Sequence, residues 1–188
     1  MQRLFHKKDG ESPLVEHGLA EIEALRAGPG YIWLDLLGEP PEAIRGLAEM
    51  FGVDQSSLEE SIDIALLPRM DEHDRYVFMV LEGLSVSTGE RLATTEIDMF
   101  IGEKFLITIH RDRFPAVEWC QAPANMTSTT GLVSPARVAA FIAQLSTRRY
   151  FPLIEALDER IDVLEDMAIA SDPRTLTEVH ALRRDVGV

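Results

Sequence analysis

The stretch EIDMFIGEKFLITIH, residues 96–110, decides how this chain folds. Residues 96–101 alternate polar and apolar side chains, which suits a half-buried strand, and Gly102-Glu103-Lys104 makes a tight connection to the apolar run at 105–110. The earlier run at 76–86 is long and rich in aromatic and β-branched residues, which are enriched in strands. The three runs therefore predict a meander of antiparallel strands.

Strand and helix patterns also alternate on the N-terminal side of this meander. The apolar run YIWLDL at 31–36 has the length and aromatic content of a buried strand. Pro40 and Pro41 fit the start of a helix, and Gly52 fits its end. The weaker expectations are an edge strand at 1–8, a helix at 14–26, a short helix capped by Asp54 or Ser56, and a turn at 87–90.

The pattern changes to helix from residue 134 onward. Ser134-Pro135 supplies a helix cap and a first-turn proline, and apolar residues then recur at helical spacing through Ala168. Pro152 is the one misfit, because a proline inside a helix costs about 3 kcal/mol. We therefore expect a kink or two abutting helices at this point. Residues 118–133 resemble a loop, and Asp172-Pro173 begins a last helix.

The composition is that of one globular domain with a strongly acidic surface. The chain has 188 residues, with 18 Lys and Arg against 32 Asp and Glu, and a formal net charge of -14. An excess this acidic repels phosphate backbones, which excludes general nucleic-acid binding and disfavours anionic lipid surfaces. Such a surface favours cations as partners, although most acidic surfaces serve only to keep a protein soluble.

Cysteine usage and hydropathy indicate the cytosol. Cys120 is the single cysteine, which excludes an intrachain disulfide framework and a thiolate zinc cluster and is typical of a reducing compartment. The first eight residues lack the apolar core of a signal peptide. No window approaches the ~20 continuous apolar residues of a membrane helix. We therefore expect a soluble, cytosolic chain.

The helix expected around residues 153–168 has two distinct faces. One is an apolar stripe that needs a packing partner, made of Ile154, Leu157, Ile161, Leu164 and Ala168. The neighbouring face is acidic, made of Glu155, Asp158, Glu159, Asp162, Glu165 and Asp166. Such a face is either simply solvated or a surface that loosely holds hydrated divalent cations, because Mg²⁺ prefers oxygen ligands.

A second acidic feature is the pair Glu59-Glu60, near a predicted helix start where the helix dipole favours negative charge. The pair alone is an incomplete metal site, because neighbouring residues on a helix do not face the same way. The five histidines form no HExxH motif, and the sequence contains neither a nucleophile elbow nor a phosphate loop. We therefore find no catalytic signature and no motif for an organic cofactor.

Five blocks of sequence follow one another in a recognisable order. They are WLDL at 33–36 with LAEMFGV at 47–53 and LEES at 58–61, PRMDE at 68–72 with YVFMVL at 76–81, the segment 101–110, RYFPL at 149–153 through IDVLED at 161–166, and LRR at 182–184. In this order they resemble the cytosolic N-terminal domain of the CorA-type magnesium and cobalt transporters. The likeness runs from about Gly30 to the end of the chain.

The resemblance implies an α/β fold, more closely an α/β/α sandwich with a largely antiparallel mixed sheet at 1–133. Long acidic helices, the willow helices of this family, would follow at 134–188, and the chain would stop before a stalk and a transmembrane pore. The resemblance implies a cytosolic regulatory domain of an inner-membrane protein, which senses intracellular Mg²⁺ or Co²⁺ and gates the pore. It implies no enzyme activity. The full-length protein would be a pentamer, and this fragment a monomer or weak oligomer.

At the level of residues, the resemblance matches Glu59 and Glu60 to the acidic pair that supplies sensing ligands in this family. The acidic face of the predicted 153–168 helix adds Asp162 and Asp166 as candidate ligands. We therefore predict that these four carboxylates contact a divalent cation.

The sequence departs from the family pattern near residue 150. Gln144 is neutral where the family carries a second carboxylate, and Arg148 and Arg149 stand where acidic residues are common. A zinc transporter of the ZntB kind, with Zn²⁺ as the ion, is therefore an alternative. Two further hypotheses remain: a soluble hydrolase with a metal bound by acidic residues, and an acidic interaction module without a transport role.

Overall fold

Seven strands form one mixed sheet in the order β2-β1-β3-β7-β6-β5-β4 in the computed structural model, which describes residues 1–8, 13–62, 67–84, 94–127 and 131–186. The strands are β1 (Gln2–Lys7), β2 (Val15–His17), β3 (Tyr31–Leu37), β4 (Arg69–Glu72), β5 (Tyr76–Leu84), β6 (Thr94–Gly102) and β7 (Phe105–His110). β3 and β7 run parallel, and the other neighbouring strands pair antiparallel. The predicted meander is confirmed as β5-β6-β7.

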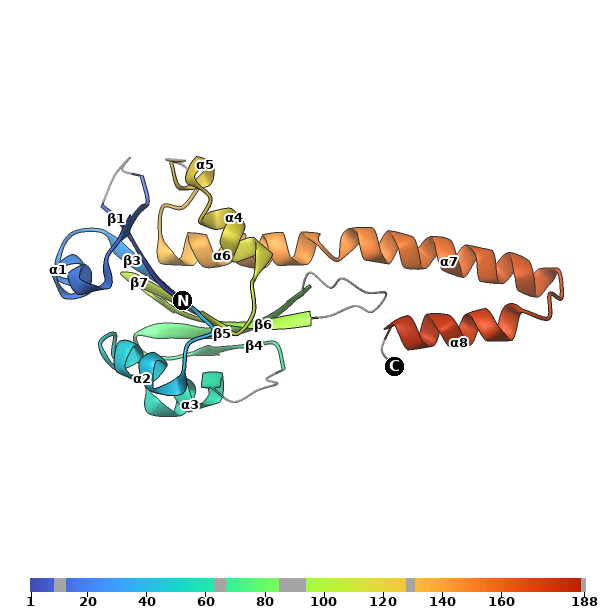
Figure 1. Cartoon of the computed structure of the whole chain (residues 1–188), viewed down its shortest axis with the longest axis horizontal. Coiled ribbons are helices and arrows are strands. Elements are labelled where there is room, and N and C mark those ends of the chain that lie inside the picture. Colours follow the sequence, from blue (N-terminus) through green and yellow to red (C-terminus); the bar gives the residue numbers. More distant parts are fainter. Residues whose placement is uncertain (9–12, 63–66, 85–93, 128–130, 187–188) are drawn as a thin grey trace.

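Helices cover both faces of this sheet (Figure 1). On one face lie α1 (Ile22–Ala27), α2 (Pro41–Glu49) and α3 (Gln55–Ile62), and on the other lie α4 (Pro115–Cys120), α5 (Pro123–Met126) and α6 (Pro135–Arg148). The first core includes Ile44 and Leu58 from the helices, and the second includes Val117 and Ile142. The two cores on opposite faces confirm the predicted α/β/α sandwich.

Two further helices extend from this body. Figure 1 shows α7 (Phe151–Ile169) running along the long axis of the molecule, with α8 (Thr175–Val186) turning back beside it. Pro152 lies in the first turn of α7, directly after α6 ends, so the expected pair of abutting helices is confirmed. α6 lies within the predicted helical region 134–188, yet it buries Val138 and Ile142 in the core of the body.

Several local predictions were wrong because short elements take their structure from packing. The expected helix at 14–26 is instead β2, a 3-10 turn at Leu19–Glu21 and α1. β2 pairs with β1 and forms the edge of the sheet, so β1 is not the edge strand that we expected. The expected loop at 118–133 contains part of α4 and all of α5, whose first residues are prolines. β4 has four exposed residues and therefore no apolar pattern to predict it from. The predicted turn at 87–90 lies outside the described residues.

Candidate functional site

The predicted ligands Glu59 and Glu60 lie on α3, and arginines from two different elements neutralise them. Arg45 of α2 donates two hydrogen bonds to Glu59, from Nε to Oε1 and from Nη2 to Oε2, both 2.8 Å. Glu60 forms an ion pair with Arg69 of β4. The hydrogen bond from Arg45 lowers the pKa of Glu59, so this carboxylate is ionised well below neutral pH. A cation at this pair must compete with both guanidinium groups.

The other two predicted ligands, Asp162 and Asp166, lie on the exposed surface of α7. Figure 1 shows α3 packed under the sheet, whereas α7 runs away from the body, so the structure does not bring the four carboxylates together. In the part of the chain that the structure describes, no three His, Cys, Asp or Glu side chains gather closely enough to hold a metal ion.

Gln144, where the resemblance leads us to expect a carboxylate, lies far from the acidic pair in the fold. It is exposed on α6, which packs on the opposite face of the sheet from α3. Arg148, at the end of α6, and Arg149, just beyond it, are also exposed. The residues of α6 and the acidic pair of α3 therefore do not meet within one chain.

The N-terminus of α3 is fixed on β5 by a cluster of polar side chains. Ser57 Oγ lies 3.3 Å from Nε2 of His73, and Nδ1 of His73 lies 3.4 Å from a carboxylate oxygen of Asp54. Tyr76 stacks on His73, and its hydroxyl lies 3.1 Å from both Ser57 Oγ and Asp54 Oδ2. The contacts run from Asp54 to His73 to Ser57, as from acid to base to nucleophile in a hydrolase triad. Ser57 is buried, however, and its Oγ accepts a hydrogen bond from Tyr76, so it is not exposed as a nucleophile would be. The cluster therefore positions α3, which carries the acidic pair.

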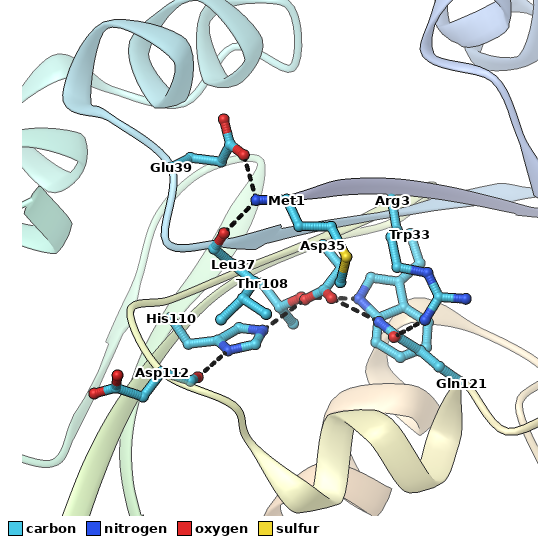
Figure 2. A network of polar contacts seen from close by, with 10 residues as sticks. All are labelled: Met1, Arg3, Trp33, Asp35, Leu37, Glu39, Thr108, His110, Asp112 and Gln121. Atoms are coloured by element: carbon cyan, nitrogen blue, oxygen red, sulfur yellow. Dashed lines mark hydrogen bonds and ion pairs between the residues drawn. The ribbon is translucent and has the colours of Figure 1, made fainter.

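Sequence reasoning missed a buried polar network between β3, β7 and α4 (Figure 2). Asp35 Oδ1 accepts hydrogen bonds from Thr108 Oγ1 at 2.5 Å and from His110 Nε2 at 2.9 Å, and Oδ2 accepts one from Gln121 Nε2 at 2.7 Å. Trp33 Nε1 donates to the same Thr108 hydroxyl at 3.0 Å. One carboxylate thus ties three elements together.

His110 is a buried cation in this network. Its two ring nitrogens face two acceptors, Asp35 Oδ1 and the carbonyl oxygen of Asp112 at 2.7 Å, so both nitrogens donate and the ring is an imidazolium. Burial opposes this charge, but the hydrogen bond and charge of Asp35, with smaller effects from Asp112 and Glu118, raise the pKa of His110. Asp35 and His110 are each 2% exposed.

A cavity of about 510 Å³ opens beside this network, lined by Arg3, Asp35, His110 and Gln121 among others. The buried polar groups that line it already bond one another, since Arg3 Nη1 also donates to Gln121 Oε1. The network therefore has a structural role and connects β3 and β7 to the end of α4. The sequence pattern that could have located it is the pairing of YIWLDL with FLITIH, which sets Asp35 opposite Thr108.

Comparison with known proteins identifies relatives of this architecture. The family model described as CorA-like Mg²⁺ transporter protein matches residues 28–188. The cobalt/magnesium transport protein CorA of Methanocaldococcus jannaschii is 25% identical over 176 residues, which are 91% of this chain and 53% of that protein.

Solved structures show the same fold. The full-length CmaX protein superposes with a TM-score of 0.76 at 20% identity, over 98% of this chain and 56% of CmaX. The ZntB cytoplasmic domain from Vibrio parahaemolyticus superposes with a TM-score of 0.70 at 15% identity, over 97% of this chain and 70% of that domain. The chain spans about half the length of the curated relatives it matches. No described helix combines the length and the apolar character that crossing a membrane requires.

Proposed function

Because the chain belongs to the family of CorA-like Mg²⁺ transporter proteins, we propose that it is the cytosolic domain of a divalent-cation transporter and regulates the pore. The observation that carries the proposal is the family match over residues 28–188, which takes in β3 to β7, α2 to α6 and the α7–α8 pair. A family of transporters is not a family of enzymes, so the chain is not an enzyme.

Glu59 and Glu60 are the residues that would hold the regulatory cation. Their side chains are 42% and 49% exposed, and carboxylate oxygens suit Mg²⁺ and Co²⁺. Two carboxylates supply only part of the six ligands that Mg²⁺ takes, and bound water or a neighbouring chain supplies the rest. Binding to this chain alone is therefore weak, on the order of millimolar.

The arginines give this pair two alternative states. Without a divalent cation, Arg45 and Arg69 hold the two carboxylates and connect α3 to α2 and β4. A bound cation takes over the carboxylate oxygens, and the guanidinium groups are released. The ties between α3 and its neighbours change with the cation concentration, which is the change that a regulatory domain must pass on to a pore.

Assembly into an oligomer completes this proposal. Gln144 and the acidic pair lie on opposite faces of one chain, so a site with ligands from both regions forms between subunits. A cyclic assembly, such as the pentamer implied by the resemblance, provides such an interface. Cation release would then leave acidic surfaces of neighbouring subunits facing one another, and their repulsion would favour the open pore.

Zinc is the alternative ion. The likeness to the ZntB cytoplasmic domain concerns the fold and does not decide the ion. Zn²⁺ prefers nitrogen and sulfur ligands, and no described histidine belongs to a group of three or more His, Cys, Asp or Glu side chains that could hold a metal ion. The acidic pair therefore favours Mg²⁺ or Co²⁺ over Zn²⁺.

Calorimetric titration of the chain with MgCl₂, CoCl₂ and ZnCl₂ at constant ionic strength tests the proposal. We expect Mg²⁺ and Co²⁺ to bind the wild-type chain, and binding to be lost in Glu59→Gln/Glu60→Gln. The control Glu23→Gln/Glu49→Gln removes the same charge from exposed positions on α1 and α2 and should bind as the wild type does. Equal Mg²⁺ binding by the α3 variant and the wild type would remove the acidic pair from the proposal. Preferential Zn²⁺ binding would favour the zinc alternative.

A further inference from the structure

Asp98 on β6 is a buried acidic side chain that the proposed cation site does not use. It is 2% exposed, and its Oδ1 has no hydrogen-bond partner among the described residues. Val80 on β5 and Ile109 on β7 stand directly opposite it in the sheet, and both are core residues. An unpaired carboxylate ion in such surroundings is costly, whereas a neutral carboxyl group is tolerated more easily.

The charged groups near Asp98 have opposing effects on its pKa. Burial, and then the charge of Glu96 on the same strand, raise the pKa of Asp98 to about 8, while Arg69 and Arg111 act against this rise. The carboxyl group therefore holds a proton at neutral pH. On the neighbouring strand β5, the charged group nearest in register is Glu82, which lies opposite Glu96 and adds no positive charge.

Both arginines that could neutralise Asp98 are held by α3. Arg69 on β4 pairs with Glu60 of α3, and its Nε lies 2.9 Å from Asp71 Oδ2. Arg111, which follows β7, donates from Nη2 to the carbonyl oxygen of Ile62, the last residue of α3, at 2.8 Å. The packing of α3 on the sheet thus holds the guanidinium groups of Arg69 and Arg111 in bonds to α3 and away from Asp98.

The sheet register places Arg69 within reach of Asp98. Arg69 stands opposite Val80, and Val80 stands opposite Asp98, so the three residues form one row across three strands. Adjacent strands are about 4.8 Å apart, which puts the two end backbones about 10 Å apart. The guanidinium of Arg69 already lies over the ring of Phe78, 5.6 Å from its centroid, in the same core as Val80.

We propose that Asp98 is a proton-binding site that controls the seating of α3 on the sheet. With the proton bound, the carboxyl group is neutral, and Arg69 and Arg111 stay on Glu60 and on the carbonyl of Ile62. When the proton leaves to solvent, the carboxylate attracts both guanidinium groups, and α3 loses these two ties. In the cation-free chain, the helix that carries the acidic pair therefore responds to pH, and this response does not depend on that pair being a cation site.

Two measurements on the full chain test the switch. The first follows the ¹³C carboxyl resonance of Asp98 from pH 3 to pH 10, and we expect its midpoint near pH 8. The second follows hydrogen exchange of the α3 amides, corrected for intrinsic rates. Between the ordinary Asp pKa of about 3.9 and the raised value, the population of opened α3 should rise by up to about tenfold per pH unit and then level off.

The variant Asp98→Asn replaces the neutral acid with a group of the same shape, so the pH dependence of α3 exchange should disappear. Glu103→Gln, an exposed carboxyl in the connection between β6 and β7, is the matched control and should keep the wild-type profile. Arg69→Gln should move the Asp98 midpoint upward, since Arg69 acts against the raised pKa. This variant and the wild-type titration decide the question even if Asp98→Asn does not fold. A wild-type midpoint near pH 4, or an unchanged α3 profile in Asp98→Asn, would overturn the proposal.

Discussion

The guanidinium group of Arg45 on α2 donates two hydrogen bonds of 2.8 Å each to the carboxylate of Glu59 on α3. Glu60, the next residue, faces a different element and pairs with Arg69 on β4. Consecutive carboxylates on one helix turn thus connect α3 to two neighbours. A divalent cation at this pair competes with guanidinium groups as well as with water, and this competition can be measured.

Removal of one competitor should strengthen cation binding. In Arg45→Gln the carboxylate of Glu59 loses its bidentate partner, so we expect the dissociation constant for Mg²⁺ to fall several-fold in calorimetric titration. Arg113→Gln is the control, since it removes an arginine from another exposed ion pair, with Glu118 of α4. If Arg45→Gln binds Mg²⁺ no better than Arg113→Gln does, Glu59 is not a ligand.

Asp35→Asn should strongly destabilise the chain. The substitution leaves the buried imidazolium of His110 without its counter-charge, and breaking one partner of a buried ion pair costs about 3–5 kcal/mol. The free energy of unfolding in urea measures this loss. Asp185→Asn, which breaks the exposed pair with Arg160, should unfold near the wild-type midpoint. An Asp35→Asn chain as stable as the wild type would show that His110 is neutral in the folded state.

The raised pKa of His110 predicts a pH dependence of stability with a definite sign. The folded chain binds this proton more tightly than the unfolded chain, so the contribution is fully present below the ordinary His pKa of about 6.5. It is lost as the pH rises through the folded-state value. Because Asp98 acts in the same direction, urea unfolding should be measured from pH 5.5 to pH 9 in an Asp98→Asn background. His110→Gln should flatten the remaining slope, and stability that rises with pH would contradict the assignment.

Gly30 precedes β3 with a φ of 92°, and a Cβ there would lie 1.9 Å from the carbonyl oxygen of Lys7. Gly30→Ala should therefore destabilise the chain by about 3 kcal/mol or more, since a strained backbone and a clash add together. Gly46 offers the opposite test, because it lies within α2 and a Cβ there meets nothing within 4 Å. Gly46→Ala should stabilise the chain by up to about 1 kcal/mol. Equal midpoints of thermal unfolding for the two variants would contradict this account of the two positions.

The acidic face of α7 gives a prediction about salts. If Asp162 and Asp166 hold divalent cations, MgCl₂ should raise the midpoint of thermal unfolding more than NaCl does at the same ionic strength. A merely solvated face predicts equal shifts, because screening depends on ionic strength alone. Asp162→Asn/Asp166→Asn should remove the difference between the two salts. Equal effects of the salts on the wild-type chain would assign this face a solubilising role.

The sequence was sufficient for the elements whose patterns are local. The meander follows from alternation in residues 96–101 and the apolar runs beside it. Pro152 marked the place where the helical pattern is interrupted, as a kink or as two abutting helices, and the structure has two helices there. Short elements such as β4 carry no such pattern, since all four of its residues are exposed. Their structure comes from pairing with a neighbour that the sequence does not identify.

The side-chain partners at the candidate site were harder to predict for a related reason. Glu59 was recognised as acidic, but its pairing with Arg45 depends on how α2 packs against α3. The bond between Asp35 and His110 joins residues on β3 and β7, whose parallel register is a tertiary property. The sequence could therefore identify Glu59 as a candidate ligand from its residue type. Which side chain each residue contacts depends on how separate helices and strands pack together.

The most direct test of the central claim is an NMR titration of the chain with Mg²⁺ at constant ionic strength, with observation of the backbone amides and the arginine Nε–H groups. The account predicts saturable shifts that are largest at Glu59 and Glu60, together with a change at the Nε–H group of Arg45 as its hydrogen bond to Glu59 breaks. A smaller change is expected at the Nε–H group of Arg69, because the Nη2 of this arginine pairs with Glu60 while its Nε pairs with Asp71. Saturable Mg²⁺ binding that leaves α3 and both arginines unchanged would contradict it.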